Sequence, residues 1–481
     1  MSKSNVGLSG ERGPILLAIM VATGLAALDT TILSTAVPSV VKDLGNFAQF
    51  PWLFSIYLLA QSVTVPLYAK ISDLFGRKPV LLLGIALFIL GSIACSFSGS
   101  MLFLILSRGL QGLGAGAIMP MTITIAGDLY TVEERSRVQG YMASVWGISS
   151  VVGPALGGLF CQYLSWQGIF VLNIPLGLAA MVLLIKNFHE TVHHRDHRLD
   201  WLGGALLTLG LSLLILALLE GGVSWTWNSV WSLGAFGLGA LFIAVFLWTQ
   251  TRVAEPILPL WVFTRPLLLT TSLISFGVGA ILLGISSYLP TFLERALGLP
   301  PLVSGSVITA LMIGWPLAAS YSGRIYLRIG FRKTSLAGIG FLLLGGLLLY
   351  TQAAHPWLPL IIGTCLVMGV GFGLAATPII VAAQASVDWN QRGVVTGTNQ
   401  FARAVGSSVG IALFGALANS VLGHSGNTPS IQAVQGATGR VFLAILVVIG
   451  LTLVAGFFMP ETDTHRPKPN EAQAGPQQVE A

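Results

Sequence analysis

Residues 79–98 read PVLLLGIALFILGSIACSFS and contain no charged side chain. A helix rises about 1.5 Å per residue, so a stretch of this length crosses the roughly 30 Å hydrocarbon core of a bilayer. Apolar stretches of similar length recur from Ile15 to Phe458, and the chain is 54% hydrophobic and only 9% charged. So few polar side chains cannot solvate a soluble globule of 481 residues. We therefore predict an all-α, multi-pass membrane protein.

The apolar pattern predicts fourteen membrane-spanning helices. Their approximate ranges are 14–38, 51–69, 79–98, 101–127, 138–160, 169–186, 200–220, 231–250, 268–290, 303–323, 334–351, 358–384, 394–420 and 438–459. With the N-terminus inside, 19 of the 24 Lys and Arg residues lie on the inner side, three lie outside and two, Arg108 and Arg403, lie within spans. This asymmetry predicts a protein of the cytoplasmic (inner) membrane with both termini in the cytoplasm. The net charge of +6 therefore sets orientation and does not indicate nucleic-acid binding.

An internal repeat relates the fifth and thirteenth predicted spans. Their glycines recur at a constant offset of 257 residues, as Gly140 with Gly397, Gly153 with Gly410 and Gly158 with Gly415. A repeat shifted by eight spans implies two pseudo-symmetric six-helix halves separated by two additional helices (6+2+6). An even shift gives both halves the same orientation, as in transporters that bind cargo between their halves near mid-membrane. The predicted divisions are an N-terminal tail (1–13), a first half (14–190), a linker with two spans (191–265), a second half (266–460) and a C-terminal tail (461–481).

The predicted loop between the second and third spans, residues 69–78, reads AKISDLFGRK. Gly76 permits a tight turn there, and Arg77 and Lys78 are cations suited to the cytoplasmic surface. Asp128 ends the fourth span at the same face. We predict that Asp73, Arg77 and Asp128 form exposed, individually weak pairs that close the cytoplasmic side and break in each transport cycle.

Four stretches resemble motifs of a known family. Residues 69–78 resemble the signature loop of the major facilitator superfamily, G-x-L-x-D-R-x-G-R-K, and depart from it at Ala69, Ile71 and Leu74. Residues 28–38 (LDTTILSTAVP), 108–116 (RGLQGLGAG) and 153–158 (GPALGG) resemble motifs of its fourteen-spanner drug:proton antiporters. Residues 165–175 follow that branch's Trp-Arg-Trp-Ile-Phe pattern, with Gln167 and Gly168 as departures. The resemblance implies alternating access driven by proton influx and export of amphiphilic drugs, dyes or lipids, and it does not name the cargo.

Asp29 is the only carboxylate deep within a predicted span. A carboxylate buried in a membrane is costly and marks a functional-site hypothesis. Arg108 lies at a similar depth on the oppositely running fourth span. Burial disfavours the charged form of Asp29 and a nearby cation favours it, so a changing separation of the two would bind and release a proton. A static structural ion pair is the alternative.

The fifth span contains a candidate hinge. Pro154 removes a backbone donor beside Gly153 and allows bending, and Gly157 and Gly158 permit close helix contact. The resemblance favours a hinge that seals the cavity during exchange, whereas the residues alone are equally consistent with a structural kink. We expect the substrate cavity to be lined by residues of several spans, with core packing as the alternative for Met119. These are Tyr57, Gln61, Gln111, Met119, Trp146, Asn399 and Arg403.

The predicted spans contain one acidic residue, Asp29, and two basic residues, Arg108 and Arg403. A dication would need more counter-charge, so we expect monocationic, neutral or weakly anionic amphiphiles as cargo. Neither the nucleophile and base of a membrane enzyme nor the repeated loops of a channel filter are found. A proton-coupled uptake symporter is the nearest alternative, and the antiporter-type stretch 153–158 disfavours it. We expect a monomer without cofactor or metal, because a solvated linker explains the four histidines of residues 187–200 as well as a metal site does.

Overall fold

The computed structural model describes residues 7–8, 10–44, 52–190, 200–221, 225–253, 256, 258–422 and 431–461. Outside these ranges lie residues 1–6 of the predicted N-terminal tail, nearly all of the predicted C-terminal tail, and His193, His194 and His197 of the predicted linker. Apart from an isolated bridge between Gly221 and Trp225, the regular structure within the described ranges is helical. This finding confirms the all-helical prediction.

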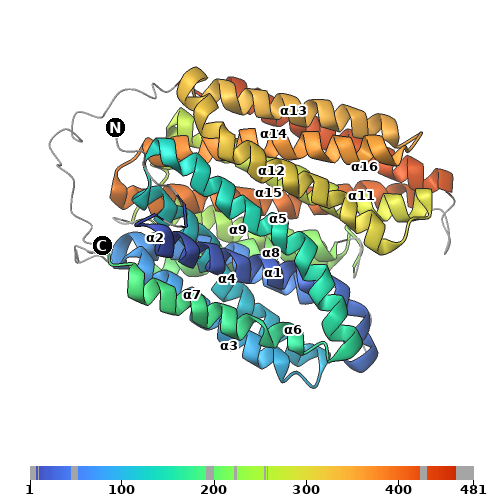
Figure 1. Cartoon of the computed structure of the whole chain (residues 1–481), viewed down its shortest axis with the longest axis horizontal. Helices are drawn as coiled ribbons and strands as arrows, with labels where there is room; N and C mark the ends of the chain where they lie inside the picture. The colour runs from blue at the N-terminus through green and yellow to red at the C-terminus, as the bar shows by residue number, and fades with distance from the viewer. Residues whose placement is uncertain are drawn as a thin grey trace.

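The helices are long and run side by side along a common direction (Figure 1). The first group comprises α1 (Gly13–Leu44), α2 (Trp52–Phe75), α3 (Arg77–Ser96), α4 (Met101–Leu129), α5 (Val132–Tyr163), the short α6 (Gly168–Val171) and α7 (Asn173–Asn187). Between the groups lie α8 (Trp201–Glu220), α9 (Val230–Gln250) and the short α10 (Trp261–Thr264). The second group comprises α11 (Pro266–Leu297), α12 (Pro301–Ile329), α13 (Phe331–Gln352), α14 (Leu358–Ala385), the 3₁₀ turn η2 (Trp389–Gln391), α15 (Arg392–Leu422) and α16 (Ile431–Phe457).

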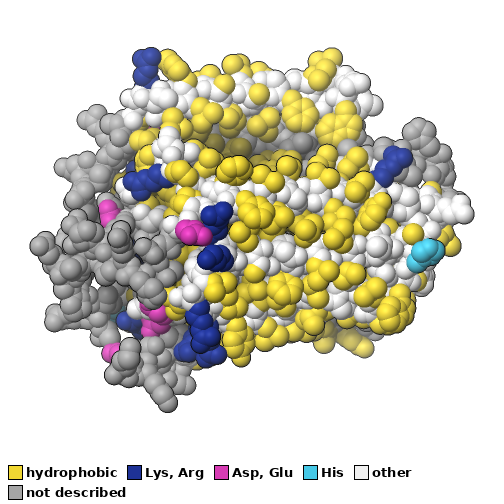
Figure 2. Space-filling view, turned by 90° about the horizontal axis from the view of Figure 1, so that it is seen from above, with side chains coloured by type: hydrophobic (Ala, Val, Ile, Leu, Met, Phe, Trp, Pro, Cys, Tyr) yellow, Lys and Arg dark blue, Asp and Glu magenta, His cyan; other side chains and the backbone are white. Residues whose placement is uncertain are grey.

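Eleven helical stretches within the described residues are long and apolar enough to cross a membrane, with α6 and α7 forming one of them. Three further helices, α8, α12 and α15, have 20, 29 and 31 residues but do not meet the same criterion. Side chains on the outer surface fit a lipid environment, because large apolar residues such as Leu90 and Leu102 are more than half exposed. Figure 2 shows this apolar surface, with Lys and Arg side chains gathered mainly toward one end.

The helices of the two groups pack in the same pattern. In the first group α1 contacts α5 and α7, α2 contacts α4, and α3 contacts α4 and α7. In the second group α11 contacts α15 and α16, α12 contacts α14, and α13 contacts α14 and α16. Matching the helices in chain order makes these two sets of contacts equivalent, as an internal repeat requires.

Small residues allow the two groups to approach closely along two seams, α5 against α12 and α2 against α15. A Cβ atom at Gly140 would lie 1.8 Å from Ser320 Oγ, and one at Gly397 would lie 2.2 Å from the Cβ of Ala69. Gly140 and Gly397 are the repeat-related pair, so equivalent glycines serve equivalent seams. Helix α8 packs against both α2 and α15, and α9 packs against α8. The additional helices therefore cover one of the two seams.

The segment expected to be a loop, residues 69–78, is almost entirely helical. Helix α2 continues to Phe75 and α3 begins at Arg77, leaving only Gly76 between them. Gly76 has a φ of 97°, which a residue with a Cβ rarely adopts. The prediction was wrong because hydropathy marks the part of a helix in hydrocarbon, and a helix satisfies its backbone equally well beyond that layer.

Candidate functional site

Asp29 on α1 and Arg108 on α4 form a buried ion pair. Arg108 Nη1 lies 2.5 Å from Asp29 Oδ2, and each side chain is 1% exposed. The Arg108 guanidinium also donates through Nε to the Leu53 carbonyl at 3.2 Å and lies over the Tyr57 ring, 4.3 Å from its centroid. Two helices of opposite direction thus place the acid and base at one depth, and α2 supplies a carbonyl and an aromatic face that hold the cation.

Two amides complete the shell around the Asp29 carboxylate. Gln111 Nε2 and Asn173 Nδ2 both donate to Asp29 Oδ1, at 3.2 and 2.9 Å. Both amides also donate to Ser92 Oγ, at 2.7 and 3.3 Å. A protonated Asp29 would have to donate a hydrogen where it now only accepts, so protonation requires this shell to rearrange. Protonation of Asp29 would therefore alter contacts that join α1, α3, α4 and α7.

Sequence reasoning missed Ser92 and Asn173 as members of this shell. Asn173 is the only polar uncharged residue in the predicted span 169–186. A buried amide in a membrane requires partners, so its isolation was a usable signal. Ser92 carried no such signal, because a serine in an apolar helix can satisfy itself by bonding to the preceding turn, as its Oγ does with the Phe88 carbonyl at 2.9 Å.

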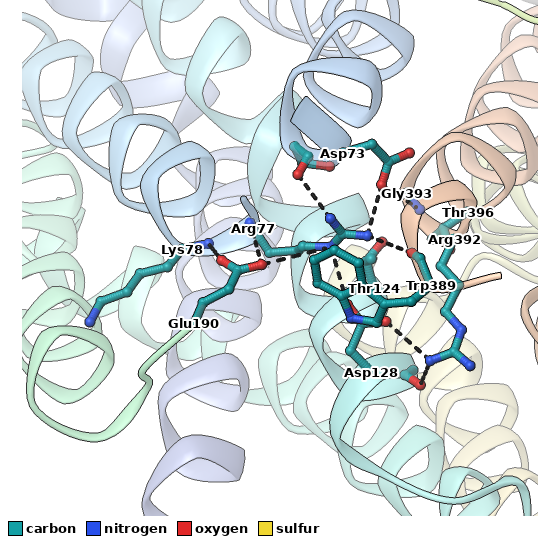
Figure 3. A network of polar contacts seen from close by, with 12 residues as sticks. Asp73, Arg77, Lys78, Thr124, Asp128, Glu190, Trp389, Arg392, Gly393 and Thr396 are labelled. Carbon is teal, nitrogen blue, oxygen red and sulfur yellow. Dashed lines mark hydrogen bonds and ion pairs between the residues drawn. The ribbon is translucent and has the colours of Figure 1, made fainter. Parts of the chain in front are cut away.

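A second polar network lies where α2, α4 and α15 meet (Figure 3). Arg77 contacts Asp73 through Nη2 at 2.8 Å and Asp128 through Nε at 3.1 Å. These pairs were expected to be exposed, and that expectation was wrong: the side chains of Arg77, Asp73 and Asp128 are 1%, 4% and 10% exposed. The second group covers this network, and the Trp389 ring lies over the Arg77 guanidinium with its centroid 3.9 Å from Cζ.

The second group completes this network with backbone and side-chain contacts. The Trp389 carbonyl accepts from Arg77 Nη2 at 2.9 Å, and Arg392 Nη1 lies 3.3 Å from Asp128 Oδ1. Asp73 accepts from the backbone N–H groups of Gly393 and Val394, at 3.1 and 2.8 Å. Those N–H groups belong to the first turn of α15, so a carboxylate from one group caps a helix of the other. The network therefore ties the two groups together at this end.

Glu190, which sequence reasoning also missed, holds the signature loop from within the first group. Its carboxylate accepts from the backbone N–H groups of Arg77 and Lys78, at 3.0 and 2.9 Å, and so caps α3 (Figure 3). Lys78 Nζ donates to the Ile185 carbonyl at 3.1 Å and to that of Phe188. Lys78 thus anchors the end of α7 and contacts neither Asp73 nor Asp128 within the described residues.

Arg135 and Arg392 are separated by the same 257-residue offset as the repeated glycines, and both donate to one backbone carbonyl. Arg135 Nη2 and Arg392 Nη1 both donate to the Gly127 carbonyl, at 2.5 and 3.3 Å. Asp128, the next residue, pairs with Arg392 and Arg77. The equivalence of Arg135 and Arg392 is visible in the sequence, but their meeting point depends on how the halves close and is not.

The candidate hinge lies inside a continuous α5, against α1. A Cβ at Gly153 would lie 2.1 Å from Thr31 Oγ1, and this hydroxyl donates to the Ser149 carbonyl at 2.9 Å. Gly157 is buried, whereas a Cβ at Gly158 would meet no heavy atom within 4 Å. The expected close contact at Gly158 is therefore wrong for this conformation. The side chain of Pro154 lies outside the described part of the structure.

The seven expected cavity residues fall into separate groups. Tyr57 and Gln111 belong to the Asp29 shell. The buried Asn399 accepts from Ser275 Oγ at 2.5 Å and donates to Thr271 Oγ1 at 3.4 Å, so α11 satisfies its amide. Arg403 stacks on Trp315, 5.1 Å from the ring centroid. Gln61, Met119 and Trp146 are half-buried.

Comparison with known proteins places this architecture in one family. The sequence profile described as Major Facilitator Superfamily matches residues 19–411. The chain is 32% identical to Multidrug transporter protein MdtP of Bacillus subtilis, over 89% of this chain and 78% of that protein, and 30% identical to Multidrug resistance protein 3 of the same organism, over 88% and 83%. The solved human organic anion transporter MFSD10 shares the fold, with a TM-score of 0.67 and 16% identity over 94% of this chain and 99% of that one. The chain belongs to the Major Facilitator Superfamily and is a membrane transporter, and these two curated relatives are named for multidrug resistance or transport.

Proposed function

We propose that this chain is a proton-coupled antiporter that exports lipophilic or amphiphilic small molecules across the cytoplasmic membrane by alternating access. The names of its curated relatives support drug-type cargo. The observation that carries the coupling is the Asp29 shell, a carboxylate buried at mid-bundle among donors from two other helices, α4 and α7. Export follows if protons enter through Asp29 while cargo leaves between the two halves.

The proposed topology has fourteen spans arranged as six, two and six. Adding α8, α12 and α15 to the eleven apolar stretches gives this number. The repeated packing pattern supports two six-helix halves, and α8 and α9 supply the two additional spans. The positive-inside asymmetry supports cytoplasmic termini. The proposed working unit is a monomer, because each half finds its partner within the same chain.

In this orientation the structure is closed at the cytoplasmic end. Arg77, Asp73 and Asp128 of the first half meet Trp389, Arg392 and the start of α15 there. Above this end Gly140 meets Ser320 and Gly397 meets Ala69, so the closed region continues along both seams. The proposed cytoplasmic gate is therefore closed in this conformation. Opening toward the cytoplasm would require all of these contacts to separate.

An uptake symporter with the same fold is the second candidate function. It would use the same buried carboxylate but would carry cargo in the direction of proton flow. The antiporter-type stretch 153–158 and relatives such as Efflux pump dotC of Dothistroma septosporum, 29% identical over 82% of this chain, favour export.

The charge of the cargo gives the first testable prediction. Arg108 neutralises Asp29, so no free acid faces a dication within the described spans. We therefore expect an imposed pH gradient to drive saturable flux of ethidium, a monocation, well above that of propidium, its dicationic relative. The measurement uses proteoliposomes with one gradient, with a neutral and an anionic lipophile in the same panel and protein-free liposomes as control. A strong preference for propidium would contradict the prediction.

A further inference from the structure

Arg403 on α15 is a cation without a counter-charge. No hydrogen bond or ion pair joins its guanidinium to any residue in the described ranges, in contrast to Arg108 and Arg77. Within the described residues, its guanidinium makes a cation–π contact with the Trp315 ring. A charged group in the membrane interior is expensive unless it is paired or reaches water. Some partner is therefore expected in at least one state of the cycle.

The position of Arg403 is internal and yet accessible. Trp315 lies 14 residues from each end of α12 (315 − 301 = 329 − 315), so the contact is at mid-membrane depth. The Arg403 side chain is half-buried, so it is neither sealed in the helix bundle nor fully exposed. Arg403 and Trp315 lie on α15 and α12, two helices of the second half that pack against α2 and α5 of the first half. The pair therefore lies on helices that border the first half.

An aromatic platform lies behind the guanidinium. The Trp315 ring stacks on Phe372 of α14, with centroids 5.1 Å apart and planes 13° apart. The guanidinium lies over the Trp315 ring, and its N–H groups make no hydrogen bond within the described residues, so they can bind a planar or tetrahedral oxyanion. Apolar and aromatic surface beside a fixed cation suits a molecule with one acidic group and a hydrophobic body.

We propose that Arg403 and Trp315 form an anion subsite that binds the acidic group of an amphiphilic cargo. This inference rests on the proposed function and adds to its substrate class molecules that carry a carboxylate, sulfonate or phosphate on an aromatic or alkyl body. Asp29 is already neutralised by Arg108, so Arg403 leaves an excess positive charge among the membrane-embedded residues Asp29, Arg108 and Arg403. Bound acidic cargo balances that charge.

The test is equilibrium binding to the purified full-length protein in lipid nanodiscs, which needs no pH gradient and so is independent of coupling. The probes are anthracene-2-sulfonate and its neutral analogue anthracene-2-sulfonamide. We expect the wild type to bind the sulfonate about tenfold or more tightly than the sulfonamide, as a charge-assisted pair predicts. Arg403→Gln should remove this preference, Arg403→Lys should keep part of it, and Trp315→Leu should weaken both probes.

Four outcomes distinguish a failed anion subsite, an inorganic occupant of the subsite and a failed antiport mechanism. A sulfonate preference that persists in Arg403→Gln, in protein that remains monodisperse, overturns the proposal. Equal binding of both probes by the wild type overturns it as well. Loss of the preference when gluconate is replaced by chloride supports the anion subsite and identifies a small inorganic anion as its occupant. If binding behaves as expected while pH-gradient-driven flux is absent, the proposed antiport fails and the subsite stands.

Discussion

Asp29→Asn should insert and fold but lose pH-gradient-driven transport, with flux falling to the level of protein-free liposomes. Asparagine keeps the volume of the side chain and can still accept from Asn173 and Gln111, but it cannot take up a proton. The expected loss is complete because no other carboxylate shares the Asp29 shell among the described residues. The measurement is uptake of ethidium into proteoliposomes under an imposed gradient, with equilibrium binding of the same dye measured in parallel.

The control for Asp29→Asn tests the effect of leaving the Arg108 charge unpaired. Removing Asp29 leaves Arg108 buried without its partner, a change that costs about 3–5 kcal/mol in other proteins. The double variant Asp29→Asn with Arg108→Gln removes both charges and should recover much of any lost thermal stability without recovering flux. If flux in Asp29→Asn matches the wild type, Asp29 does not carry the proton and the pair is structural.

Arg77→Ala should shift the protein toward the inward-open conformation. The substitution removes the hydrogen bond to the Trp389 carbonyl and the stack on its ring, which join the halves, and it leaves Asp73 and Asp128 without their shared cation. Each hydrogen bond to a charged group contributes about 1.5–3 kcal/mol, so the conformational equilibrium should move roughly tenfold or more. Cytoplasmic labelling of a single cysteine placed between α2 and α15 measures the shift.

The repeat offers a matched control for Arg77→Ala. Arg332 lies at the start of α13, the helix that matches α3 in chain order, but its contacts are to the Phe457 carbonyl and, at 4.0 Å, to Glu461 in the same half. Arg332→Ala removes a cation of equal size without touching the interface between halves, so labelling should stay at the wild-type rate. Glu190→Gln should give an intermediate increase, because Glu190 holds α3 and, among the described residues, forms no hydrogen bond or ion pair with the second half. Equal labelling of all variants would contradict a gate at Arg77.

Features that depend on hydropathy or on rare charged residues could be predicted from the sequence. Asp29 and Arg108 stand out because a charge in an apolar span has few explanations, and their equal depth follows from helix rise alone. The meeting of Asp73, Arg77 and Asp128 could be expected because all three lie at one membrane face. The all-helical class follows from the length of the apolar stretches.

Contacts that depend on the approach of the two halves could not be predicted. Trp389 and the first turn of α15 bury the Arg77 network, but nothing in residues 389–394 marks them as partners of a loop more than 300 positions earlier. The same holds for Asn399, expected in the cavity on the basis of its helix but satisfied by Ser275 and Thr271. Helix rotation decides both cases, and a single apolar helix in lipid carries little information on its rotation.

The most direct measurement of proton antiport starts without a pH gradient. Wild-type proteoliposomes loaded with ethidium and an entrapped pH dye are diluted into dye-free buffer of equal pH, so that only the ethidium gradient can drive exchange. Antiport predicts that the lumen acidifies as ethidium leaves, at a rate that saturates with ethidium and vanishes in Asp29→Asn. Ethidium efflux with no change in luminal pH, or with alkalinisation of the lumen, would contradict the account.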